Sequence, residues 1–130
     1  MIQTIFGESE IHKHKRLADL DPKEMETIRE IVEADGFMFE SHEVHTDDGY
    51  ILEIHRVYKE EFKSKGNEMP AVFLQHGILG SSECFILNGK DSAAYKFANQ
   101  GYDVWLGNNR GTIYGYKHET LNPFKKTDQQ

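Results

Sequence analysis

Two short apolar segments joined by one helical segment constrain the fold of this chain more than any other feature. Residues 71–75 (AVFLQ) are apolar without alternation, which is typical of a strand covered on both faces. Residues 102–107 (YDVWLG) predict a second buried strand. Between them, residues 92–100 offer alanines and a phenylalanine for packing, and Gly101 is a stop signal for a helix. Strand, helix and strand with short connections predict a parallel βαβ unit.

A helix and a hairpin are predicted before this unit. Asp21 suits the N-cap, Pro22 the first turn and Gly36 the end of a helix. Its apolar stripe is formed by Met25, Ile28, Ile31 and Val32. Two alternating runs around the turn at residues 47–49 (DDG) predict a β-hairpin with one half-buried face. The polar residues 59–68 and those after residue 107 are interpreted as loops, so the whole predicts an α/β sheet.

Composition and charge exclude several classes of function. The chain has 130 residues, 38% hydrophobic content and a formal net charge of −7, which argues against nucleic acid and anionic membrane surfaces as partners. The single Cys84 excludes an internal disulfide. No window approaches the roughly 20 apolar residues of a transmembrane helix. The first twenty residues lack a run of signal-peptide length and are predicted to form a tail.

Function in an open α/β sheet gathers beyond the carboxyl ends of its strands, here residues 76–82 and 107–115. Gly77 and Gly80 are expected to give the first loop backbone conformations closed to other residues. A backbone N–H in such a loop can face a developing negative charge, as in an oxyanion hole, although a simple tight turn is the commoner explanation of such glycines when they are taken alone. Phosphate-loop and dinucleotide glycine motifs are absent, and no histidine pair has a convergent third metal ligand.

Three blocks of the sequence resemble the N-terminal part of the acid lipase family, which includes gastric and lysosomal acid lipases. The blocks are HEVHTDDGYILEIHRV, AVFLQHGILGSS and GYDVWLGNNRG, and the resemblance covers about residues 22–124. It implies that residues 21–130 form a partial α/β-hydrolase lipase domain with an incomplete sheet, after a tail of residues 1–20. It also implies hydrolysis of triacylglycerols or steryl esters through a Ser-His-Asp triad, with no metal or organic cofactor. Members are usually secreted or lysosomal, so the missing export signal leaves the compartment open.

The resemblance assigns roles to individual residues. The residue after His-Gly gives a backbone N–H to the oxyanion hole in this family, and that residue here is Ile78. His76 is expected to shape the loop, because the triad histidine of this fold lies near the C-terminus of the domain. Asn109 stands where the family commonly has serine. Asn108 and Arg110 are expected to hold the second loop by hydrogen bonds.

The sequence lacks a recognisable nucleophile. None of its serines lies in the G-x-S-x-G elbow, and Ser81 and Ser82 follow the wrong strand, so a loop turn explains them better. The leading hypothesis is an N-terminal fragment of a lipase-type carboxylic ester hydrolase with the oxyanion loop but no triad, inactive alone. The alternative is a non-catalytic binding module of the same fold; a thioesterase is disfavoured by the specificity of the three blocks. In the hydrolase strand order, residues 71–75 would lie beside the nucleophile strand, so self-association through this exposed sheet edge is expected.

Overall fold

The computed structural model describes residues 27–64, 68–122 and 125 of the chain. The predicted tail at residues 1–20 therefore lies outside the described residues, as do Asp21, Pro22 and Met25 of the predicted helix.

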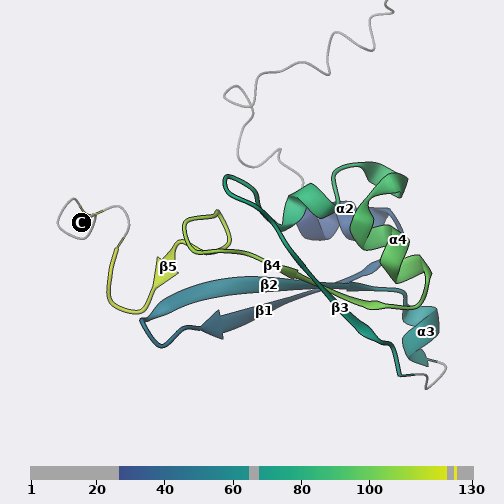
Figure 1. Cartoon of the computed structure of the whole chain (residues 1–130), viewed down its shortest axis with the longest axis horizontal. Helices are drawn as coiled ribbons and strands as arrows, with labels where there is room; N and C mark the ends of the chain where they lie inside the picture. The colour runs from purple at the N-terminus through teal and green to yellow at the C-terminus, as the bar shows by residue number, and fades with distance from the viewer. Residues whose placement is uncertain (1–26, 65–67, 123–124, 126–130) are drawn as a thin grey trace, which may run out of the picture.

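The described residues form one open, mixed sheet (Figure 1). Its main strands are β1 (Met38–His45), β2 (Tyr50–Tyr58), β3 (Ala71–Gln75) and β4 (Asp103–Gly107), in the order β1-β2-β4-β3. Strands β1 and β2 are antiparallel, as are β2 and β4, whereas β3 and β4 are parallel. The predicted hairpin, the parallel unit and the α/β class are confirmed.

The helices that cover the sheet lie on one of its sides (Figure 1). They are α2 (Ile28–Ala34) and α4 (Ala93–Asn99), and both pack their buried residues into the same core. Two 3-10 turns, η3 (Ser82–Phe85) and η4 (Gly89–Asp91), connect β3 to α4. The predicted helix at residues 92–100 is confirmed within a residue at each end, and Gly101 has the expected left-handed backbone at φ +88°.

Helix α2 begins later than the sequence predicted. Thr27 is extended (φ −71°, ψ 154°), its hydroxyl accepts from the Glu30 N–H, and the Glu30 carboxylate accepts from the Thr27 N–H at 2.7 Å. This reciprocal capping box starts the helix at Ile28, so the prediction of an N-cap at Asp21 for this helix was wrong. The predicted end was right, because Gly36 follows the helix with φ +83°.

Two segments predicted to be loops contain regular structure. Helix α3 (Glu60–Ser64) lies within residues 59–68, and strand β5 (Lys117–His118) lies in the segment after residue 107. Strand β5 pairs with Tyr50 and Ile51 of β2, some 67 residues earlier in the chain. No local pattern in two residues predicts such a pairing, because it exists only through tertiary contact.

The core lies between the sheet and the two helices. It consists of Ile28, Val32, Phe37, Phe39, Val57, Ile86, Ala94, Tyr95, Ala98, Val104 and Leu106. On β2 the buried side carries His55 and Val57, while the alternating residues Leu52 and Ile54 on the opposite side are half-buried. We refer to this opposite side of the sheet, which α2 and α4 do not cover, as the open face.

Strand β3 is not covered on both faces as predicted. Val72 and Leu74 pack against the core, but no residue of the strand is fully buried, and Phe73 on the open face is 56% exposed. The reason is position: β3 is an edge strand in the described sheet, and both packed helices lie on its other side.

Candidate functional site

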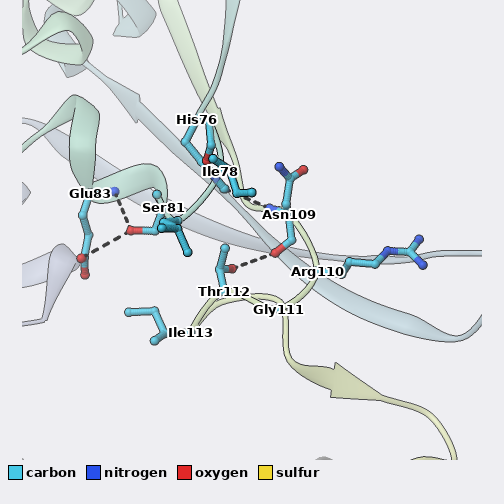
Figure 2. Close-up of a pocket in the computed structure, with 12 residues that line it drawn as sticks. His76, Ile78, Ser81, Glu83, Asn109, Arg110, Gly111, Thr112 and Ile113 are labelled. Atoms are coloured by element: carbon cyan, nitrogen blue, oxygen red, sulfur yellow. Dashed lines mark hydrogen bonds between the residues drawn. The ribbon is translucent and has the colours of Figure 1, made fainter. Parts of the chain in front are cut away.

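Two loops meet beyond the carboxyl ends of the parallel strands β3 and β4. They line a pocket of about 720 Å³, with residues 76–81 and 83 on one side and residues 109–113 on the other (Figure 2). The structure thus brings together the two loops that the sequence selected, and Ile78 lies in the pocket lining between them. Parallel pairing explains this, because it places both carboxyl ends at the same edge.

The first loop exposes two aliphatic side chains. Ile78 is 95% exposed and Leu79 is 101% exposed, and Leu79 has a left-handed backbone at φ 63°. Gly77 and Gly80 do not have positive φ, so the special conformation expected of them belongs to Leu79 instead. A non-glycine residue in this region costs roughly 1–2 kcal/mol, which the rest of the loop must offset. Gly80 lies close to His76, since a Cβ at Gly80 would lie 3.2 Å from that of His76, which is tighter than most such contacts.

His76 joins the start of the first loop to the second loop. The Asn109 backbone N–H donates to Nε2 of His76 at 3.1 Å, so this nitrogen carries no proton. The proton therefore lies on Nδ1, which donates to the Gly77 carbonyl at 2.7 Å. Both ring nitrogens of this buried side chain are thus used inside the fold, which agrees with a loop-shaping role and not with a catalytic base.

Asn108 anchors the far end of the first loop. Its Oδ1 accepts from the Ser82 backbone N–H at 2.8 Å, and its Nδ2 donates to the Glu53 carbonyl at 2.9 Å. Asn108 and Ser82 are both buried, at 3% and 0% exposure. One amide side chain therefore connects β2, the end of β4 and the loop after β3.

The second loop turns tightly on its own hydrogen bonds. The Asn109 carbonyl accepts from the Thr112 hydroxyl at 2.9 Å (Figure 2), and the Gly111 N–H donates to the Gly115 carbonyl at 3.0 Å. Gly115 admits no side chain, because a Cβ there would lie 2.4 Å from the Asn109 carbonyl oxygen. Arg110 points out of the loop and pairs with Asp48 in the β1–β2 turn. Asn108 and Arg110 thus hold the loop as expected, although their partners lie in other elements.

A buried serine–histidine pair lies behind the first loop. His55 Nδ1 lies 2.8 Å from the Ser82 hydroxyl, and its Nε2 lies 3.6 Å from the Glu53 carboxylate. This order of groups resembles a catalytic triad, but His55 and Ser82 are 1% and 0% exposed and neither lines the pocket. The pair therefore supports the loop. Burial lowers the pKa of His55 below its ordinary value, against the opposing effect of the Glu53 carboxylate.

Sequence reasoning missed His55 as a partner of the loop. The sequence signal for this role was the alternation along β2: His55 lies two residues before Val57 and therefore on the same inward face of the strand. Ser81 was interpreted correctly as a turn residue, since its hydroxyl accepts from the Glu83 N–H at the start of η3 (Figure 2). Within the described ranges, no group of three or more His, Cys, Asp or Glu side chains has the arrangement of a metal site, and no helix has the length and apolarity to cross a membrane.

Comparison with known proteins identifies the family. Residues 28–89 match the family region described as "Partial alpha/beta-hydrolase lipase region". The chain is 44% identical over 91 residues to "Lipase 3" of Drosophila melanogaster, covering 69% of this chain and 23% of that protein. It is 38% identical over 110 residues to the human "Lysosomal acid lipase/cholesteryl ester hydrolase", covering 82% and 27%. The chain belongs to the acid lipase family. It corresponds to an N-terminal part of the lipase-type hydrolase and spans about a quarter of the length of these relatives.

The anchoring of the first loop in this acid lipase segment is testable at Asn108. Asn108→Ala leaves the buried Ser82 N–H and Glu53 carbonyl unpaired, and we expect it to lower the free energy of unfolding by about 2–4 kcal/mol. Asn109→Ala is the matched control, because that side chain is exposed, and we expect a change within about 0.5 kcal/mol. Urea denaturation measures both, and amide hydrogen exchange at Ser82 should accelerate only in the first variant. Equal effects of the two substitutions would contradict the anchoring role.

The buried His55 predicts a pH dependence of stability. The pKa of His55 is lower in the folded state than in the unfolded chain. As the pH falls through the ordinary histidine value of 6.5, the unfolded chain therefore binds more protons at this residue than the folded chain does. The contribution of neutral His55 is complete above this pH and is lost progressively below it. We expect the unfolding free energy to decrease from about pH 7 to pH 5 and the decrease to be smaller in His55→Gln. Urea denaturation at several pH values checks this, and an unchanged slope in the variant would contradict it.

Proposed function

We propose that the chain carries the oxyanion loop of a lipase-type carboxylic ester hydrolase, with the Ile78 backbone N–H as a donor. The observation that carries the proposal is the support of this loop at both ends, by His76 and Asn108, while Ile78 itself lines the pocket. Within the described ranges, no group accepts a hydrogen bond from the Ile78 N–H. A donor held in place before the reaction loses little free energy to reorganisation when the charge develops.

The chemistry that such a loop serves is acyl transfer. When a nucleophile attacks an ester carbonyl, negative charge develops on the carbonyl oxygen, and one positioned donor lowers the barrier by roughly 3–4 kcal/mol. Membership of the family and the names of its relatives support a lipid ester as the substrate class. No serine of these 130 residues lies in G-x-S-x-G. We therefore propose that the nucleophile, the acid and the base of the complete hydrolase are residues outside this sequence.

A non-catalytic binding module is the second candidate. The pocket and the exposed Ile78 and Leu79 beside it favour binding of an amphiphilic ligand even without turnover. The two candidates share the pocket and differ in whether the loop serves chemistry in a longer protein.

Hydrolysis of a p-nitrophenyl ester tests the absence of a nucleophile. We expect the chain to release p-nitrophenol no faster than buffer alone does. In the part of the chain that the structure describes, Ser82 is the only serine that pairs with a histidine, and its side chain is buried. Ser81→Ala and Ser82→Ala are the matched variants, and neither should change the rate. Turnover above buffer that disappears in one of these variants would show that the chain has its own nucleophile.

Binding of a carboxylate tests the donor itself. Octanoate presents a negatively charged oxygen and an aliphatic chain, and we expect it to shift the amide resonance of Ile78 in a saturable manner. Ile78→Ala keeps the backbone N–H and should keep binding, whereas Ile78→Pro removes the donor and should abolish it. Equal binding by the two variants would contradict a role for this N–H, whatever the outcome of the ester assay.

The partner surface of the chain follows from the incomplete sheet. We infer that the free edge of strand β3 associates with a further polypeptide. The support is that β3 has a neighbouring strand on one side only among the described residues.

A further inference from the structure

The pocket between the two loops has one carboxylate in its lining, that of the half-buried Glu83 in the 3-10 turn η3 (Figure 2). Three aliphatic side chains of the same lining, Ile78, Leu79 and Ile113, are largely exposed. A ligand in this pocket therefore meets aliphatic surface and a carboxylate together, which restricts the head groups that it can carry.

The Glu83 carboxylate is held in place by hydroxyl groups. The Tyr114 O–H donates to Oε1 of Glu83 at 2.7 Å, and the Ser81 hydroxyl lies 3.4 Å from Oε2. Tyr114 is itself fixed, because its ring packs edge-on against the buried His55 ring with centroids 4.6 Å apart, and its carbonyl accepts from the Glu53 N–H at 2.8 Å. Burial and the Glu83 carboxylate raise the pKa of Tyr114, so the phenol keeps the proton that it donates.

The charge of Glu83 has no cationic partner in the part of the chain that the structure describes. Arg110 is the one arginine or lysine in the pocket lining, and it donates to both carboxylate oxygens of Asp48. The Arg110 guanidinium also lies over the Tyr50 ring at 4.5 Å. Because Arg110 is already engaged, Glu83 leaves the pocket with one uncompensated negative charge.

We propose that Glu83 sets the charge preference of the pocket, which takes amphiphiles with an uncharged or cationic head and disfavours anionic ones. This inference rests on the proposed function, because it uses the same pocket, and it narrows the class of ligand. A fixed carboxylate repels an anionic head more strongly beside aliphatic surface than in water, because the effective dielectric constant is lower there. An ester carbonyl is uncharged when it binds, so the preference does not oppose ester binding at the Ile78 N–H.

Three eight-carbon ligands of different charge test the proposal. Octanoate, octanamide and octylammonium are titrated against the chain at pH 7, with the amide resonances of the two loops as the readout. In Glu83→Gln we expect octanoate to bind at least about threefold tighter, octylammonium at least about threefold weaker and octanamide equally well. The glutamine keeps an acceptor for the Tyr114 O–H, so the fold should be unchanged by circular dichroism. Equal changes for all three ligands, as a purely structural role predicts, would overturn the proposal.

Two further variants separate charge from other effects. Glu60→Gln changes the net charge by the same amount, and Glu60 is exposed in α3, at the opposite end of β3 from the pocket (Figure 1). It should leave all three affinities unchanged, and an effect equal to that of Glu83→Gln would refute a local role. Glu83→Asp keeps the charge and should keep the order of affinities. Raising the ionic strength from about 0.01 to about 0.1 M should weaken the preference in the parent, because the Debye length falls from about 30 to about 10 Å.

The outcome is separate from that of the donor test. If Ile78→Ala and Ile78→Pro bind octanoate equally while the charge order depends on Glu83, only the donor role is refuted. If the two Ile78 variants differ and the charge order is the same with and without Glu83, only the charge preference is refuted. A parent chain that binds none of the three ligands refutes the charge preference as well.

Discussion

The parallel pairing of β3 with β4 is the constraint on which the rest of the structure depends. It places the carboxyl ends of the two strands next to each other, so that His76 at one end reaches the Asn109 backbone at the other. It also brings Asn108 beside Ser82, where one amide group satisfies two backbone groups that are far apart in the sequence. With an antiparallel pair, the two loops would leave opposite ends of the sheet and these contacts would not exist.

These contacts explain how the first loop tolerates an unfavourable conformation. Leu79 has a left-handed backbone and a fully exposed aliphatic side chain, and neither feature stabilises the fold. The buried hydrogen bonds at His76 and Ser82 enclose this segment on both sides, and the His55–Ser82 pair adds support from β2. Because the buried support lies at the two ends, Ile78 and Leu79 remain free to face the pocket. A segment with this division into rigid ends and exposed centre is suited to present a backbone donor.

Much of the architecture could be predicted because local sequence patterns determine it. The Asp-Gly turn predicted the hairpin, and Gly101 predicted the end of α4. Two of the features that sequence reasoning missed are decided by tertiary contact. Strand β5 exists only because Lys117 and His118 meet the start of β2. The N-cap at Thr27 is a different case, because the Thr-x-x-Glu capping box is a local pattern that the sequence interpretation overlooked. The supporting role of His55 depends on Ser82, 27 residues away, which no spacing rule connects to it.

Strand β3 is the element for which the cover expected from the sequence differs from the cover in the structure. The sequence AVFLQ is apolar on both faces, and this predicted cover on both sides. The structure has helices on one side, with Phe73 placed over Gly107 on the other, where any side chain at Gly107 would meet the Phe73 ring at 2.6 Å. Because Gly107 has no side chain, the ends of the Phe73 and Gln75 side chains can approach its backbone closely. The two-sided apolar pattern therefore reports the composition of β3, whereas the cover on each face is decided by the elements that pack there.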